Sequence, residues 1–272
     1  MTRLLTQLHR TRCSPTVSFP GVAASALTLA LALSVVLPPA HAGISSDSPR
    51  PGAPGIMEPP TGSLLVDYYE AFLRDRDIES FRLNVLARYT EGTLTRLLES
   101  SNPEARRSAV LALGLVGSFK VNAALARALR DSDATVRSLA DNALWAVWFR
   151  ADTPENNAAL EQVVFLIGRQ QPEKAIEQAT RLIAVAPKFA EAYNQRAIAY
   201  FKLGDYQASA ADCRRVLERN PYHIGALGGL AQCQLRLDQR QDALKTLRRA
   251  LKLQPFSEGL REVVASLEAE DR

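Results

Sequence analysis

The residues that could support catalysis are few, and they form no known catalytic pattern. The chain has three histidines, and two of them, His9 and His41, lie in its first 42 residues. Histidine is the usual proton carrier near neutral pH, and a serine or cysteine nucleophile needs such a base. The sequence has no Gly-rich phosphate loop, nucleophile elbow, Cys-x-x-Cys or His-Glu zinc motif. We therefore expect a protein that is not an enzyme and that holds no cofactor and no metal. His223, in the short Asn220-Pro221-Tyr222-His223 segment, is expected to be a turn residue rather than a ligand.

The N-terminus has the pattern of a secretory signal peptide. Residues 1–20 contain arginines and no acid, residues 21–37 are apolar and uncharged, and residues 38–42 read Pro-Pro-Ala-His-Ala. This order predicts a signal over 1–42 that is cut after Ala42. We expect an exported protein, periplasmic or secreted. The alternatives are a signal that stays uncut and anchors the chain in the membrane, and an organellar import signal.

The charge balance does not favour nucleic acid as a partner. The chain of 272 residues has 33 Lys and Arg against 29 Asp and Glu, a net charge of +4. Arg3, Arg10 and Arg12 lie in the predicted signal, so the rest of the chain is nearly neutral. A composition that is 47% apolar and 23% charged excludes a disordered or collagen-like chain. Residues 43–62, rich in Pro and Gly, are expected to form a disordered linker.

Prolines at a fixed spacing divide the C-terminal part into three similar units. Pro187, Pro221 and Pro255 are 34 residues apart, and each follows an amphipathic helical pattern. The units are 156–187, 190–221 and 224–255, and residues 256–272 have the pattern of a polar-backed helix that would cap the last unit.

These units resemble the tetratricopeptide repeat (TPR). The middle unit reads AEAYNQRAIAYFKLGDYQASAADCRRVLERNP, in which small residues, Ala197 and Ser209, face each other across the two helices. Two departures are Ala159, where an aromatic residue is usual, and Gln234 in place of a tyrosine. The resemblance implies stacked helical hairpins over residues 153–272.

Residues 63–152 have a second period. The segments NPEARRSAVLAL (102–113) and DATVRSLADNAL (133–144) align at an offset of 31, which places Arg106 and Arg137 at equivalent positions. This pattern resembles short HEAT repeats, with residues 64–89 as an irregular opening pair. The expected fold is therefore all-α: an α-α superhelix, or solenoid of helical hairpins, in which a HEAT-like segment precedes three TPR units and a capping helix.

Trp145 and Trp148 lie where the two repeat segments meet. We expect them to be buried, to cover the first helix of the TPR segment and to join both segments into one solenoid. The alternative is an exposed aromatic platform for a ligand.

The resemblance to TPR proteins also predicts a concave groove that binds a protein or peptide partner. In that family the groove is lined by fixed positions of each first helix. The predicted groove residues are Leu160, Val164, Ile167, Glu191, Asn194, Ile198, Phe201, Lys202, Gln232, Leu235 and Arg236, and the same positions add Asn157, Gly168, Gly225 and Gly228. The chaperone-binding subfamily holds a C-terminal carboxylate with Lys and Asn, but Leu160 and Val164 occupy those positions here, so no such clamp is expected.

Two further features concern Cys213 with Cys233 and a basic cluster in the last unit. The cysteines are placed on two helices that should pack together. They either form a disulfide in an oxidising compartment or remain two small buried apolar residues.

The basic cluster of the last unit is interspersed with acids. This pattern favours a solvated helix face, although contact with an anionic membrane is compatible with it. It comprises Arg236, Arg240, Lys245, Arg248, Arg249 and Lys252.

Taken together, these patterns predict a non-enzymatic, exported scaffold or adaptor that binds a protein or peptide. The alternatives are an accessory subunit of an enzyme, because HEAT-like repeats also occur in proteins resembling phycobilin lyases, and a structural element of the cell envelope.

Overall fold

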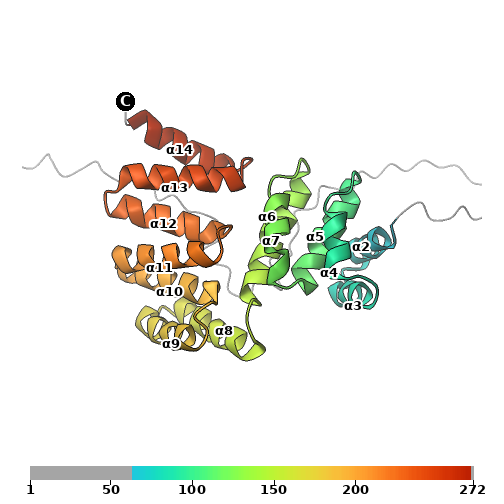
Figure 1. The fold of residues 1–272 in the computed structure, drawn as a ribbon, viewed down its shortest axis with the longest axis horizontal. Coiled ribbons are helices and arrows are strands. Elements are labelled where there is room, and N and C mark those ends of the chain that lie inside the picture. Colours follow the sequence, from blue (N-terminus) through green and yellow to red (C-terminus); the bar gives the residue numbers. More distant parts are fainter. Residues whose placement is uncertain (1–62, 271–272) are drawn as a thin grey trace, which may run out of the picture.

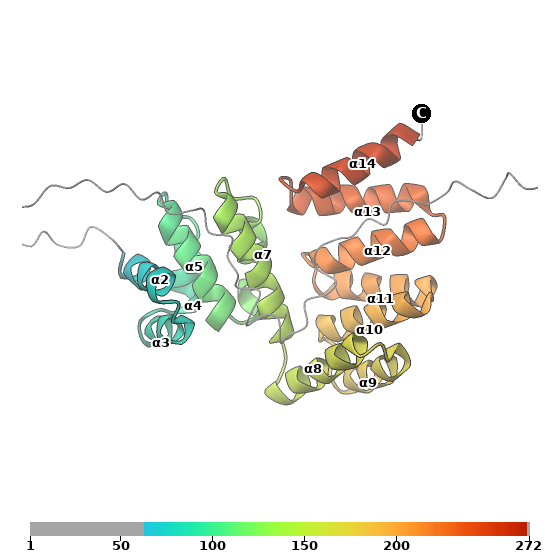
Figure 2. The same cartoon turned by 180° about the vertical axis from the view of Figure 1, so that it is seen from behind.

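The computed structural model describes residues 63–270, and every regular element in that range is a helix. The predicted signal (1–42), the predicted linker (43–62) and the last two residues lie outside the described residues. The helices form two stacks, shown in Figures 1 and 2: α2 to α7 in one and α8 to α14 in the other. The predicted all-α solenoid of helical hairpins is thus the observed fold.

The first stack contains the HEAT-like repeats. Its helices are α2 (Leu64–Asp75), α3 (Ile78–Arg88), α4 (Glu91–Leu97), α5 (Pro103–Val116), α6 (Asn122–Ala128) and α7 (Ala134–Phe149), with a single 3-10 turn η1 (Phe119–Val121) before α6. Both α4 and α6, and both α5 and α7, begin 31 residues apart, as the sequence period predicts. Asn102 and Asp133 cap α5 and α7 by accepting a backbone N–H of the first turn.

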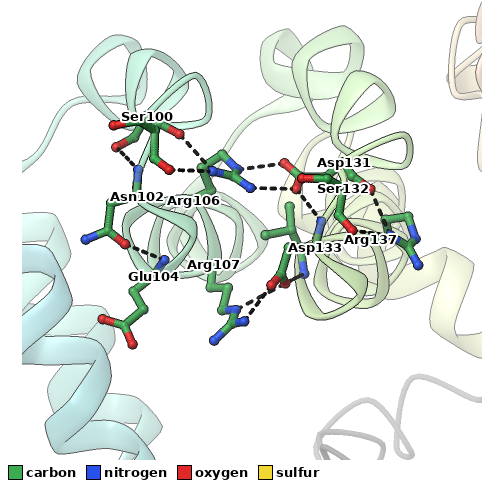
Figure 3. A network of polar contacts seen from close by, with 11 residues as sticks. Ser100, Asn102, Glu104, Arg106, Arg107, Asp131, Ser132, Asp133 and Arg137 are labelled. Carbon is green, nitrogen blue, oxygen red and sulfur yellow. Dashed lines mark hydrogen bonds and ion pairs between the residues drawn. The ribbon is translucent and has the colours of Figure 1, made fainter.

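A repeated set of arginine contacts fixes these hairpins, as Figure 3 shows. Arg106 binds the carboxylate of Asp131, and Arg107 binds that of Asp133, so α5 is tied to the turn between α6 and α7 in the next repeat. Between α5 and α7 the backbones approach closely, because a Cβ at Gly114 would lie 3.0 Å from the Cβ of Ala143.

The second stack contains the three helical hairpins and one more helix. Its helices are α8 (Pro154–Gly168), α9 (Pro172–Val185), α10 (Ala190–Leu203), α11 (Tyr206–Arg219), α12 (Ile224–Arg236), α13 (Arg240–Leu253) and α14 (Glu258–Glu270). The small residues that the sequence places between paired helices are buried, as in the pair of Ala197 and Ser209, where the Ser209 hydroxyl donates to the Ala197 carbonyl at 2.8 Å. The turn after α10 uses Gly204 at φ 80°, a left-handed conformation that favours glycine.

The two stacks do not continue each other along one axis. In both views α7 runs crosswise to the stacked helices α10 to α14 and lies beside their ends. Contacts from α7 reach residues far along the chain: Gln254 donates to the Asp141 carboxylate at 3.1 Å, and the Arg137 guanidinium lies over the Phe256 ring. The chain therefore turns after α7, and the second stack packs its inter-hairpin linkers against that helix.

Candidate binding surface

The contact between the two stacks is built around His223, in the linker between α11 and α12. Its ring is fully buried and stacks on the Trp148 ring at 4.1 Å between centroids, while the edge of Trp145 meets it at 5.4 Å. Trp148 itself is 2% exposed. The predicted burial of Trp148 is confirmed, and Trp145 is half-buried.

The element that these tryptophans cover differs from the prediction. We expected the first helix of the TPR segment, α8, but the ring contacts of Trp145 and Trp148 go to His223 at the start of α12, two hairpins further along the chain. Trp145 also lies on Gly225, where a Cβ would approach its Cη2 to 2.5 Å. The sequence period could not show this, because it places repeats in order without fixing the turn after α7.

His223 holds a buried polar cluster as well as the aromatic stack. Its Nδ1 accepts the Ala226 backbone N–H at 3.0 Å, which caps α12, so Nε2 carries the hydrogen donated to Glu191 Oε2 at 2.8 Å. The other oxygen of Glu191 accepts hydrogen bonds from Asn194 and Gln195 at 2.8 and 2.7 Å. Each polar group here has a partner within the protein, which is the usual condition for burying a carboxylate. His223 is therefore more than a turn residue: it links α10, α12 and α7.

A second polar chain crosses the same contact. The Trp148 indole N–H donates to Asn122 at 2.7 Å, and the Asn122 amide donates to Asn220 at 2.9 Å. Asn122 and Asn220 are 98 residues apart and both are buried. These contacts give the two stacks a fixed relative position.

The structure corrects the predicted groove at five side chains and at Gly228, all of which are buried. Glu191 and Asn194 are 1% and 3% exposed because they belong to the polar cluster around His223, beneath α7. Leu160, Val164 and Ile167 are buried as well, since Leu160 packs against Phe189 and Ile167 packs in the core with Val163 and Ala175. These five side chains give a partner no accessible surface. The prediction assumed a concave face left free by its neighbours, but α7 covers Glu191 and Asn194, and α9 and α10 pack on the apolar residues of α8.

Six other predicted groove residues remain at the surface, towards the ends of α10 and α12 that point away from α7, whereas Gly225 lies under Trp145. Lys202 and Arg236 are exposed, and Ile198, Phe201, Gln232 and Leu235 are half-buried. Tyr206, which the prediction missed, joins them: its ring meets Phe201 at 5.2 Å, and the Arg236 guanidinium lies over it at 5.7 Å. We call this set the open end; its members are Ile198, Phe201, Lys202, Tyr206, Gln232, Leu235 and Arg236.

The open end combines aromatic and aliphatic surface with two cations. In the part of the chain that the structure describes, neither Lys202 nor Arg236 takes part in an ion pair. Half-buried aromatic residues beside arginine are typical of the positions that contribute most to protein–protein binding.

The two cysteines lie together in the core between α11 and α12. Both are free thiols and are at most 2% exposed, and the Cys233 thiol donates to the Ser209 hydroxyl at 3.2 Å. The hydrogen bond with Cys233 and burial together raise the pKa of Cys213. The disulfide stays a prediction.

The basic cluster of the last unit is engaged in several local contacts. Arg248 forms an ion pair with Glu268 of α14, Lys245 with Asp242, and Arg249 donates to the Pro221 carbonyl. No helix within 63–270 has the length and apolar character needed to cross a bilayer, and those residues include no cluster of His, Cys, Asp or Glu suited to a metal ion.

Comparison with known proteins identifies both repeat kinds. Residues 200–267 match the tetratricopeptide repeat family, and residues 90–164 match HEAT repeats. A TPR repeat-containing protein of Rhizobium etli is 28% identical over 138 residues, which covers 51% of this chain and 68% of the relative. The protein SGT1 homolog of Bos taurus is 33% identical over 84 residues, 31% of this chain and only a quarter of that protein. Among solved structures, the Sgt2 TPR domain from Aspergillus fumigatus has 19% identity and a TM-score of 0.41, covering 44% of this chain and 81% of that one. The chain thus carries TPR and HEAT-like repeats.

Proposed function

We propose that this protein is a non-enzymatic, exported scaffold that binds a protein or peptide partner at the open end. The observation that carries the proposal is the group formed by Phe201, Tyr206 and Arg236, which lies at the surface with the rest of the open end. TPR stacks act through such surfaces, because each repeat contributes a few side chains to an extended face.

Site-specific photocrosslinking in the native host tests the binding surface. A photoreactive residue at Gln232 should give a discrete crosslinked protein, whereas the same group at Glu218, exposed on α11, should not. Phe201→Ala should reduce the yield at Gln232 because it removes the aromatic surface of the open end. Equal crosslinking at both positions, or a yield at Gln232 that Phe201→Ala leaves unchanged, would argue against the proposal.

The export part of the proposal has its own test. It is supported by the arginine-rich start, the apolar run and the Ala-His-Ala sequence that ends at Ala42. Cell fractionation followed by N-terminal sequencing should find the protein outside the cytoplasm, beginning at Gly43. A chain found only in the cytosol and still beginning at Met1 would contradict export without affecting the binding proposal.

A further inference from the structure

The arginine contacts of the HEAT-like repeats show, within this chain, what each arginine binds. Arg106 uses its Nη1 to donate to the carbonyls of Ser100 and Ser101, at 2.9 and 3.3 Å. Its remaining edge, Nε and Nη2, donates to both oxygens of Asp131 at 2.7 and 2.8 Å. Figure 3 shows the two functions together: the arginine closes its own turn and grips a carboxylate of the next repeat. Such a bidentate pair is both strong and specific for carboxylate geometry.

Arg137, one period later, performs only the first of these functions. Its Nη1 donates to the carbonyls of Asp131 and Ser132 at 2.8 and 2.9 Å, which matches the contacts of Arg106. No hydrogen bond or ion pair within residues 63–270 engages its Nε and Nη2. The position one period after Asp131 is Gln162, an exposed residue of α8. Arg137 therefore has no equivalent of the Asp131 carboxylate that Arg106 binds, because glutamine stands at that position of the next period.

Arg137 also lines a cavity of about 270 Å³ between α7 and the linker that precedes α14. Its lining includes Arg137, Ser138 and Asn142 of α7 and Gln254 and Phe256 of the linker. Ser138 stands one period after Arg107, so a small residue occupies the place of a large one. The Arg137 guanidinium carbon lies over the Phe256 ring, 4.2 Å from the ring centroid, which places the cation at the wall of this cavity.

We propose that this cavity binds an aspartate or glutamate side chain of a partner protein, with the carboxylate held by Nε and Nη2 of Arg137 as Asp131 is held by Arg106. The cavity lies at the stack contact and does not include residues of the open end, so this site is independent of the proposed function. A phosphorylated side chain fits less well, because Asp141 also lines the cavity and repels a dianion more strongly than a single carboxylate.

Asp141 makes a gain-of-binding test available. Its carboxylate accepts a hydrogen bond from Gln254 at 3.1 Å and has no ion-pair partner within the described residues, so its charge opposes an incoming carboxylate. Asp141→Asn keeps the oxygen that Gln254 binds and removes the charge. We expect this variant to bind the probe about three- to tenfold more tightly than the unchanged protein, a difference of about 0.7–1.4 kcal/mol.

The probe is a blocked Gly-Asp-Gly peptide, titrated into the purified ¹⁵N-labelled protein while the Arg137 Nε–H signal is followed by NMR. The peptide should shift this signal saturably, whereas a Gly-Asn-Gly peptide of the same shape should not. Arg137→Lys keeps the positive charge but loses the paired N–H donors that bind a carboxylate in a bidentate manner, and it should weaken binding by about fivefold or more. Arg130→Lys, an exposed arginine outside the cavity, is the matched control and should bind normally.

Several results would overturn the proposal. One is the absence of a saturable shift up to about 10 mM peptide, far weaker than a specific contact, in both the unchanged protein and Asp141→Asn. Another is equal binding of the Asn peptide or an unchanged affinity in Arg137→Lys. Tighter binding of a phosphoserine or lysine peptide would assign the cavity to a different ligand chemistry. The expected pattern combines tighter binding in Asp141→Asn with weaker binding in Arg137→Lys. Misfolding of Arg137→Lys could weaken binding in that variant, but it could not produce the gain in Asp141→Asn.

Discussion

His223 connects the two stacks, and replacing it by asparagine isolates that role. Asparagine is a favoured N-cap residue, so His223→Asn keeps a hydrogen-bond acceptor for the start of α12. It removes the ring that stacks on Trp148, and it removes the Nε2–H group that donates a hydrogen bond to Glu191 Oε2 at 2.8 Å. The substitution therefore tests the contact between stacks with little change to the helix itself.

The expected loss follows from these two contacts. A stacked aromatic pair contributes about 0.5–1.5 kcal/mol beyond its buried area. A hydrogen bond to a charged group contributes about 1.5–3 kcal/mol, and here the acceptor remains buried without that donor. We expect His223→Asn to lower the free energy of unfolding by about 2–4 kcal/mol.

Tryptophan fluorescence is the appropriate assay because the two tryptophans of the chain both contact His223. Urea unfolding should be followed by this signal and by circular dichroism at 222 nm. The variant should show red-shifted native emission and a fluorescence transition that precedes the helix transition. Lys188→Asn, an exposed position in the preceding linker, is the control and should change the free energy by less than about 0.5 kcal/mol. A loss below about 1 kcal/mol with unchanged emission would refute the assigned role of His223.

Three further predictions concern other contacts of the fold. Gly225→Ala should destabilise the protein by about 1–3 kcal/mol and alter tryptophan emission, because the new methyl group displaces Trp145. Burial raises the pKa of Asp141 from 3.8 to about 6. The folded state then holds this proton more tightly than the unfolded chain, so the free energy of unfolding falls as the pH rises from 3.8 through about 6. Asp141→Asn should remove this pH dependence and raise the free energy of unfolding at pH 7 by about 1–3 kcal/mol, measured by urea unfolding. In a chain lacking residues 1–42, the buried thiols of Cys213 and Cys233 should resist a thiol reagent in the native state and both react in urea.

Each of these has a contrary outcome. Gly168→Ala, where a Cβ meets nothing within 4 Å, is the control for Gly225→Ala, and equal effects of the two would remove Trp145 from the explanation. A stability of Asp141→Asn that keeps the original pH slope would show that another group titrates in that range. Failure of Cys213 and Cys233 to react even in urea would establish the disulfide and displace the assignment as free thiols.

The sequence by itself determined the helical hairpins. Prolines every 34 residues end second helices, and the offset of 31 predicted the helix starts and the equivalent positions of Arg106 and Arg137. These features are local: they depend on caps, on breakers and on small residues that face each other within one repeat. The sequence also anticipated the burial of Trp148, because a large aromatic side chain exposed to water is unfavourable.

Only the tertiary structure decided which predicted groove residues are accessible. A repeat period fixes neighbours along a stack but carries no information about the turn between two stacks. That turn brings α7 against the linkers, buries Glu191 in the cluster around His223 and leaves Phe201 and Arg236 at the surface. It also places Phe256 on Arg137, 119 residues earlier in the chain, and so forms a cavity that no local pattern encodes. The physical reason is that burial depends on which surfaces meet, and those contacts are made between residues about 100 positions apart.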